Sequence, residues 1–290
     1  MSGGGDRCVS CKCFGWACDQ GQRATNEDGF FFADGFCSRG LGDKACYFAV
    51  IDGHNGADCA QYVTKTLPEV VERELQADRD TSRNNEEWIC TQLAASHVYV
   101  DDMLRENRVL GGAVSASCLL FEDNKKTRWL YTSHLGDVRA VLCRGKNASR
   151  LTSPGEHKVS DPAEQARVQD AGGSIVNGRV NGSLAIGRAF GNHEFKKPAL
   201  PDDVVSRIPD MTITRLIPSD MFVIVACDGL WDVIEDQDAV TLVLQLLHVT
   251  SSVHPSQHRK HFPDVLARCL VDEALHRGSQ DNVTVLVVFV

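Results

Sequence analysis

The sequence lacks long apolar runs and has fewer basic than acidic residues. No stretch approaches the roughly 18 apolar residues of a transmembrane helix, so we expect no membrane-spanning segment. Lys and Arg total 30 against 39 Asp and Glu, which gives a formal net charge of −9 over 290 residues. This deficit argues against nucleic-acid binding, because such binding neutralises backbone phosphates with Lys and Arg.

The N-terminus also lacks the signals that send a chain to a membrane or out of the cell. Residues 1–5 have neither the basic start nor the apolar core of a signal peptide, and Ser2 stands where N-myristoylation needs glycine. We therefore expect a cytoplasmic protein, with the nucleus as a second location, whose 12 cysteines stay mostly reduced. We also expect a monomer.

Several of the cysteines crowd a glycine-rich stretch at the start of the chain, namely Cys8, Cys11, Cys13 and Cys18. The CxxCxC spacing would allow a zinc clip, but no second CxxC pair or histidine follows at the spacing of a zinc finger. We favour a flexible arm over residues 1–20 and keep the zinc clip as the alternative.

After the arm, the periodicity of apolar residues indicates strands in clusters and helices in pairs. Helical spacing predicts helices over 56–76, 86–107, 163–171, 238–248 and 262–277. Short apolar runs between turn residues predict strands at 46–51, 114–121, 128–133, 138–143, 221–227 and 282–290. We expect the three runs between 114 and 143 to form antiparallel hairpins. The Gly-, Asn- and Pro-rich residues 152–215 predict a flap-like insertion over one edge of the core.

This order of elements predicts an α+β fold. Strands and helices do not alternate, which argues against a doubly wound parallel sheet. A four-layer α-β-β-α sandwich, with two central antiparallel sheets flanked by helix pairs, fits the order better. We expect it to form one domain over residues 21–290.

Acidic residues recur at the ends of the predicted strands. They are Glu27, Asp28, Asp52, Asp137, Asp228 and Asp281. A single Asp at a strand end is usually a turn former, but this many sites predict a shared cleft. Crowded carboxylates raise one another's pKa and oppose folding unless cations lie among them. Oxygen ligands favour Mg²⁺ or Mn²⁺ over Zn²⁺, and two such ions can direct a water at a phosphate.

Six short motifs follow one another along the chain. They are Arg23–Asp28 (RATNED), Phe48–Gly56 (FAVIDGHNG), Leu135–Ala140 (LGDVRA), Arg179–Gly191 (RVNGSLAIGRAFG), Cys227–Val233 (CDGLWDV) and Ser279–Val285 (SQDNVTV). Each motif alone is weak, whereas all six in one order are specific. Together they resemble the PPM/PP2C family of metal-dependent serine/threonine protein phosphatases, over about residues 21–290.

The resemblance implies two bound Mg²⁺ or Mn²⁺ ions and a third, weaker metal site. Asp52 would bridge the two ions. The other implied ligands are the Gly53 carbonyl, Asp228 and Asp281 for the first ion, Glu27 supported by Asp28 for the second, and Asp137 with Asp228 for the third. The implied substrates are proteins phosphorylated on serine or threonine.

The resemblance also implies roles for three polar side chains. Arg23 would grip the substrate phosphate, because a guanidinium matches two phosphate oxygens. His54 would be the general acid that protonates the leaving oxygen, since imidazole titrates near neutral pH. Asn282 would position a metal-bound water. The alternatives are a surface ion pair of Arg23 with Glu27, and a loop histidine bonded to backbone.

The chain departs from the family's pattern near the predicted flap. Val114 stands at the usual threonine and is followed by Ser115, which would turn the hydroxyl to the opposite face of a strand. Asn192 and Glu156 each stand where the family has aspartate, and Gly187 replaces a serine. We expect these changes to affect flap anchoring, a weak metal site or substrate choice, while leaving the direct ligands of the two metal ions intact.

Three functions compete. An active protein serine/threonine phosphatase is favoured. A pseudophosphatase would keep the fold as a binding module, but the intact Asp52, Asp228 and Asp281 argue against it. A different metallohydrolase, such as a nuclease, is disfavoured by the acidic composition and the lack of Lys- and Arg-rich stretches.

Overall fold

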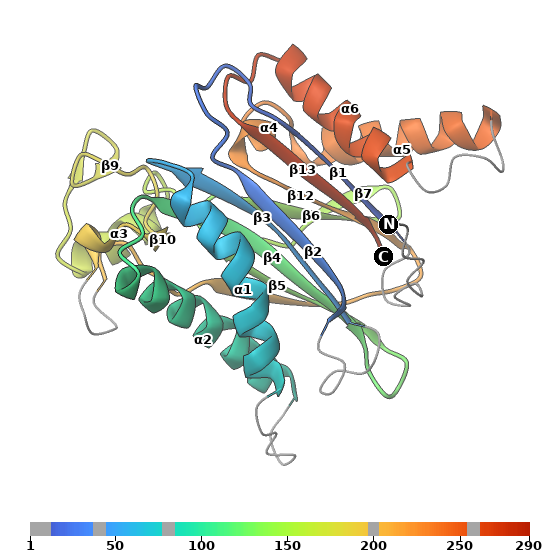
Figure 1. Cartoon of the computed structure of the whole chain (residues 1–290). Coiled ribbons are helices and arrows are strands. Elements are labelled where there is room, and N and C mark those ends of the chain that lie inside the picture. Colours follow the sequence, from blue (N-terminus) through green and yellow to red (C-terminus); the bar gives the residue numbers. More distant parts are fainter. Residues whose placement is uncertain (1–12, 37–44, 77–84, 197–202, 254–261) are drawn as a thin grey trace.

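The computed structural model describes residues 13–36, 45–76, 85–196, 203–253 and 262–290. Two antiparallel sheets stack face to face, and a pair of helices covers the outer face of each (Figure 1). The predicted four-layer α-β-β-α sandwich is confirmed.

The strands of each sheet come from distant parts of the chain. The first sheet has the order β1 (Cys13–Asp19), β13 (Val283–Phe289), β12 (Asp220–Ala226), β6 (Arg139–Arg144) and β7 (Asn147–Arg150). The second has the order β11 (Asp210–Arg215), β5 (Arg128–Leu135), β4 (Gly112–Glu122), β3 (Ala45–His54) and β2 (Gly29–Phe36), with β10 (Phe190–Gly191) beside β4. A small ribbon of β8 (Ile175–Val176) and β9 (Arg179–Val180) lies in the flap.

The long helices pack on the outer faces of the two sheets. α1 (Asp58–Gln76) and α2 (Asn85–Glu106) cover the second sheet, and α5 (Asp236–Val253) and α6 (Phe262–His276) cover the first. The short helices are α3 (Pro162–Asp170), the single-turn α4 (Asp228–Trp231) and the 3₁₀ turn η1 (His193–Phe195). Among the described helices, none is long and apolar enough to cross a bilayer.

Burial on both faces explains why the strands are apolar along their length. In β4, Val114 and Ala116 point into the core between the sheets, whereas Ala113 and Leu119 face α1 and α2. A sheet covered on both faces needs apolar residues at successive positions, so its strands form continuous apolar runs. These runs are the signal that located the strands in the sequence.

The prediction of a flexible arm is wrong for residues 13–19. They form β1, which pairs with β13 from Cys13–Phe289 to Asp19–Val283. Phe14 stacks on Phe32 of β2 with 3.7 Å between ring centroids, which ties this edge strand to the second sheet. Glycine and cysteine in this segment obscured its strand character. Cys8 and Cys11 lie outside the described residues.

The predicted hairpin between residues 128–133 and 138–143 is also wrong. β5 pairs with β4 as expected, but β6 pairs with β12 in the other sheet. The link at Gly136–Asp137 therefore carries the chain from one sheet to the other. A hairpin and a crossover leave the same alternation of apolar residues, so the sequence pattern cannot distinguish them.

The flap-like insertion is shorter than the predicted 152–215. Residues 210–215 form β11, a full edge strand that pairs with β5 from Asp210–His134 to Arg215–Trp129. The alternating sequence of this strand follows a Gly-, Asn- and Pro-rich segment, which concealed it. β10, inside the predicted flap, also joins the second sheet.

Gly15 provides a test of β1. A Cβ atom at Gly15 would lie 2.0 Å from the carbonyl carbon of Pro263 in α6. Gly15→Ala should therefore push β1 from α6 and lower the free energy of unfolding by about 1–3 kcal/mol in urea denaturation. Gly155→Ala is the matched control, because a Cβ there meets no atom of the described residues within 4 Å. Equal stability of the two variants would contradict the packing of β1 on α6.

Candidate active site

Acidic side chains from both sheets converge at one end of the sandwich. Carboxylate oxygens of Asp28 and Asp52 and the thiol of Cys227 all lie within 4.8 Å of one another. The charges of Asp228, Asp137 and Asp281 also raise the pKa of Asp52. The structure thus brings Asp28 and Asp52 together, with Asp228, Asp137 and Asp281 near enough to act on Asp52 electrostatically.

Asp52 lies within β3, although the sequence predicted that the strand would end before it. β3 continues to His54 and pairs with β4, with Asp52 opposite Val114 and His54 opposite Gly112. Gly53 packs directly on the preceding loop, where a Cβ atom would lie 2.4 Å from the carbonyl oxygen of Glu27. The regular pairing of β3 holds this part of the site rigidly.

Burial and mutual repulsion perturb the carboxyl groups strongly. The pKa of Asp52 is raised well above its usual range by burial and by the charges of Asp28, Asp228, Asp137 and Asp281. Burial, supported by neighbouring carboxylates, raises the pKa of Asp228 to about 7 and those of Asp28 and Asp137 to about 6.

The same group of carboxylates fits a hard divalent cation. Both carboxylate oxygens of Asp28 are buried and accept no well-formed hydrogen bond among the described residues, although Thr284 and Cys227 lie near enough to offset part of the rise that burial causes in its pKa. Buried oxygens without partners are costly, and oxygen-rich sites suit Mg²⁺ or Mn²⁺. The carboxylates of Asp28 and Asp52, with Asp228 near enough to raise the pKa of both, therefore suit the expected ions, and the Cys227 thiol lies beside them.

Glu27 and Asn282 are joined by a hydrogen bond between distant segments. The Glu27 backbone N–H donates to Asn282 Oδ1 at 2.8 Å, and Glu27 Oε2 accepts from the Gly56 N–H at 2.9 Å. Asn282 Nδ2 donates to the carbonyls of Gln20 (2.8 Å) and Thr25 (3.0 Å). Asn282 thus holds the loop that carries Glu27. These bonds use both N–H groups of the Asn282 amide and one lone pair of Oδ1, so the second Oδ1 lone pair is what remains in the side chain to bind a water. The water-positioning role of Asn282 stays a prediction.

Arg23 lies at the exposed rim of the acidic group. Its guanidinium pairs with Asp281 at 2.5 Å, and 62% of its side chain is exposed. The ion pair considered from the sequence, with Glu27, is replaced by this pair with Asp281.

His54 contacts a residue of the flap. Its Nε2 atom lies 2.7 Å from Oδ1 of Asn192, and burial lowers the pKa of the imidazole. The sequence marked Asn192 as a departure from the family's pattern with an expected effect on flap anchoring or a weak metal site, and it gave no indication of the contact with His54.

Asp137 lies at the crossover between the sheets and faces a lysine. Lys158 Nζ is 3.7 Å from Asp137, 3.2 Å from Glu156 and 3.2 Å from Asp232. Burial acts against the charged lysine, but these carboxylates outweigh it and raise the pKa of Lys158. An ammonium group therefore lies at the residue expected to form the third metal site.

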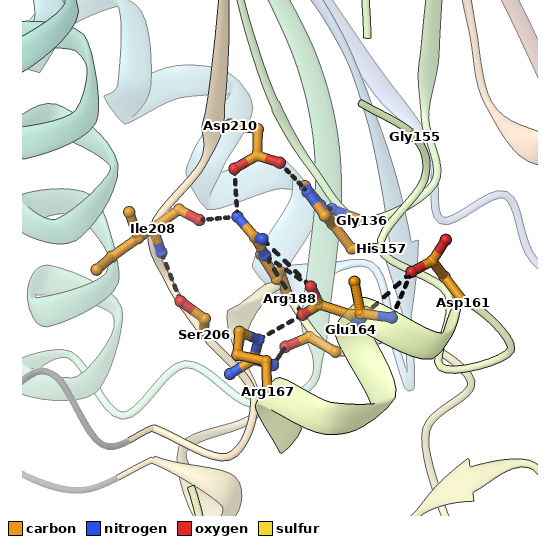
Figure 2. Close-up of polar contacts among 12 residues, drawn as sticks. Gly136, Gly155, His157, Asp161, Glu164, Arg167, Arg188, Ser206, Ile208 and Asp210 are labelled. Carbon is orange, nitrogen blue, oxygen red and sulfur yellow. Dashed lines mark hydrogen bonds and ion pairs between the residues drawn. The ribbon is translucent and has the colours of Figure 1, made fainter. Parts of the chain in front are cut away.

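A chain of polar contacts joins the flap to the crossover (Figure 2). The Gly136 N–H donates to His157 Nδ1 at 2.9 Å, and His157 Nε2 donates to Asp210 at 3.1 Å. Asp210 also accepts from Arg188 at 2.7 Å, and Arg188 in turn pairs with Glu164 of α3. The flap is thereby anchored to the residue that precedes Asp137.

His134, His157 and Asp210 form a second cluster, with ligand atoms within 4.8 Å of one another. The rings of His134 and His157 stack in parallel, with centroids 4.6 Å apart and planes 5° apart, so their in-plane lone pairs do not converge. His157 Nδ1 accepts from Gly136, so Nε2 carries the proton donated to Asp210. This cluster anchors the flap and does not suit a metal ion.

The shifted hydroxyl of β4 lies where the sequence predicted. Val114, opposite Asp52, is part of the core between the sheets. Ser115 pairs with Ile51, whose side chain faces α1 and α2. Directly opposed residues share a face, so the Ser115 hydroxyl points away from the inter-sheet core.

Comparison with known proteins gives a consistent result. The family model for Protein phosphatase 2C matches residues 14–283. Protein phosphatase 2C homolog 1 of Saccharomyces cerevisiae is 36% identical over 92% of this chain and 89% of its own length. The protein of the same name from Schizosaccharomyces pombe is also 36% identical, over 83% of this chain but only 63% of its own length.

Solved structures agree with the sequence comparisons. A sex-determining protein of C. elegans aligns with a TM-score of 0.77 and 29% identity, over 95% of this chain and 64% of that chain. A serine-threonine phosphatase 2C from Toxoplasma gondii shares the fold, with a TM-score of 0.71 and 22% identity over 95% of this chain and 94% of that chain. Given the matched family model and these relatives, the chain belongs to the protein phosphatase 2C family of hydrolases.

Proposed function

We propose that the protein hydrolyses phosphoserine and phosphothreonine monoesters in proteins, using a water activated by two divalent cations, Mg²⁺ or Mn²⁺. The observation that carries this proposal is the group of buried carboxylates around Asp52, whose pKa values are raised by burial and by the charges of neighbouring carboxylates. Membership of the protein phosphatase 2C family supports the same activity.

The chain supplies a consistent set of residues to hold the cations. Asp52 has carboxylates from both sheets around it, which suits a bridging ligand. The remaining proposed ligands are the Gly53 carbonyl, Asp228, Asp281 and Glu27, with Asp28 in support and Asp137 at a third, weaker site. Two observations support a bound cation at this site. The Asp28 oxygens accept no well-formed hydrogen bond among the described residues, and Asp281 already pairs with the positive charge of Arg23.

Arg23 would bind the substrate phosphate. Its guanidinium neutralises Asp281 in the structure and is largely exposed. A cation held by Asp281 would neutralise the Asp281 carboxylate in place of Arg23. The guanidinium would then be free to turn toward the substrate. The fork of N–H donors could then bind two phosphate oxygens.

His54 would donate a proton to the leaving serine or threonine oxygen. It lies two residues after Asp52 on the same strand, and its ring contacts Asn192. Burial lowers its pKa, which makes the protonated imidazole a stronger acid. An alkoxide leaving group needs this proton.

Replacing Asp52 by Asn tests the metal site. Asp52→Asn should abolish both Mn²⁺ binding and phosphatase activity, as measured by calorimetric titration and phosphopeptide hydrolysis. It should also raise the melting temperature of the metal-free protein, because Asn removes the cost of keeping a titratable carboxyl buried among other carboxylates, a cost that the raised pKa of Asp52 reflects. Asp170→Asn, at an exposed position, is the control and should leave all three unchanged. Wild-type Mn²⁺ affinity in Asp52→Asn would exclude the bridging role.

Replacing His54 by Gln tests the general acid. The value of kcat/KM for a phosphothreonine peptide should fall by about 10²–10⁴-fold. The loss on p-nitrophenyl phosphate should be much smaller, since its leaving group needs no proton. His276→Gln, on the exposed end of α6, should change neither value. Equal losses on both substrates would argue against proton donation by His54.

Replacing Lys158 tests the third site. Lys158→Met removes the ammonium that lies among Asp137, Glu156 and Asp232. The affinity of a third Mn²⁺ should then rise by about tenfold, measured by calorimetry or by equilibrium dialysis. Lys158→Arg retains the positive charge and serves as the control. An unchanged Mn²⁺ stoichiometry and affinity in Lys158→Met would show that the lysine does not compete with a cation.

A further inference from the structure

The contact between His54 and Asn192 joins the proposed general acid to the flap. The Asn192 side chain is 2% exposed, and its Oδ1 lies 2.7 Å from His54 Nε2. An amide oxygen only accepts hydrogen bonds, so His54 Nε2 must carry a proton and donate it. Nδ1 is then the nitrogen that can exchange a proton with the substrate.

Asn192 makes this contact in place of the hydrogen bond that the side chain of an N-cap residue usually forms. It precedes η1 as the N-cap residue, where an asparagine side chain normally accepts from a backbone N–H of the first turn. No such capping bond forms. Its backbone has φ 49° and ψ 46°, a left-handed conformation that asparagine tolerates better than most residues. The left-handed backbone conformation thus occurs at the residue whose side chain contacts His54.

Buried contacts fix the backbone around Asn192. Its N–H donates to the Gly111 carbonyl at 2.9 Å, and the N–H of Gly191 donates to Asp101 of α2 at 2.8 Å. Asp101 also binds Lys196 at 2.5 Å, and both of these side chains are fully buried. The position of Asn192 is therefore set by α2 and by the flap together.

The adjacent strand leaves space for the contact. A Cβ atom at Gly112 of β4 would lie 2.0 Å from Asn192 Oδ1 and 2.3 Å from His54 Nε2. Any other residue at this position would crowd both groups, so that at least one of them would have to shift. The glycine at position 112 of β4 and the left-handed backbone of Asn192 thus both favour the hydrogen bond between His54 and Asn192.

We propose that Asn192 is a positioning residue that holds the His54 ring and keeps one proton on Nε2, so that the second proton of the imidazolium lies on Nδ1 and passes from there to the leaving oxygen, returning His54 to the neutral form protonated on Nε2. This inference rests on the general-acid role of His54 proposed above. A group that accepts from the second nitrogen of a histidine fixes both its tautomer and its orientation. The flap thereby contributes to catalysis through His54, without needing to touch the substrate.

Three variants test the proposal. Asn192→Gly removes the acceptor and permits the left-handed backbone, so kcat/KM for a phosphothreonine peptide should fall by about 10–100-fold. The value for p-nitrophenyl phosphate should fall less than about threefold, because general-acid help is not needed there. Asn192→Asp keeps an acceptor oxygen and should restore peptide hydrolysis. Asn177→Gly, at an exposed asparagine with φ 52°, is the matched backbone control and should resemble wild type.

A spectroscopic measurement provides a readout apart from activity. In metal-free, ¹⁵N-histidine-labelled protein, His54 should be protonated at Nε2 in the wild type and in Asn192→Asp. It should become a mixture of tautomers in Asn192→Gly. The His54 signals are assigned by their absence in His54→Gln.

The outcomes separate this proposal from the proposed function. If the wild type hydrolyses neither substrate, the phosphatase function fails. If His54→Gln loses both substrates equally, the general-acid role fails, and this inference with it. If His54→Gln is selective while Asn192→Gly loses neither substrate or both equally, or keeps the wild-type tautomer, the inference alone is overturned. A double variant of His54→Gln and Asn192→Gly should lose no more than His54→Gln, because the two residues act as one unit.

Discussion

The structure depends on a group of carboxylates that is unfavourable without cations. Asp52 lies in the second sheet, whereas Asp228 follows a strand of the first, and burial and mutual repulsion raise the pKa values of both. The stacking of two regular sheets is what holds such groups together against their repulsion. Ion binding relieves the repulsion, so the energy stored by this arrangement favours divalent cations.

Basic side chains of the chain itself already offset part of this charge. Arg23 pairs with Asp281 at the rim, and Lys158 lies beside Asp137. Both have long side chains whose positive charge an ion could replace. An acidic protein can in this way present positive charge to a negatively charged substrate, although its net charge is −9.

The flap links two parts of the site that lie on different strands. Through Arg188, Asp210 and His157 it holds Gly136, next to Asp137 (Figure 2). Through Asn192 it holds His54 at the end of β3. The departures from the family's pattern at Asn192 and Glu156 therefore occur where the flap meets the proposed catalytic groups.

Sequence alone determined the layers of the fold and singled out the acidic residues that are proposed to hold the ions. Continuous apolar runs marked strands buried on both faces, and the order of short motifs identified Asp52, Asp228 and Asp281. Only the tertiary structure decided that residues 13–19 form an edge strand, that Gly136–Asp137 crosses between sheets, and that Asn192 binds His54. Apolar periodicity reports which face of an element is buried, but it carries no information on which distant strand or side chain lies beside it.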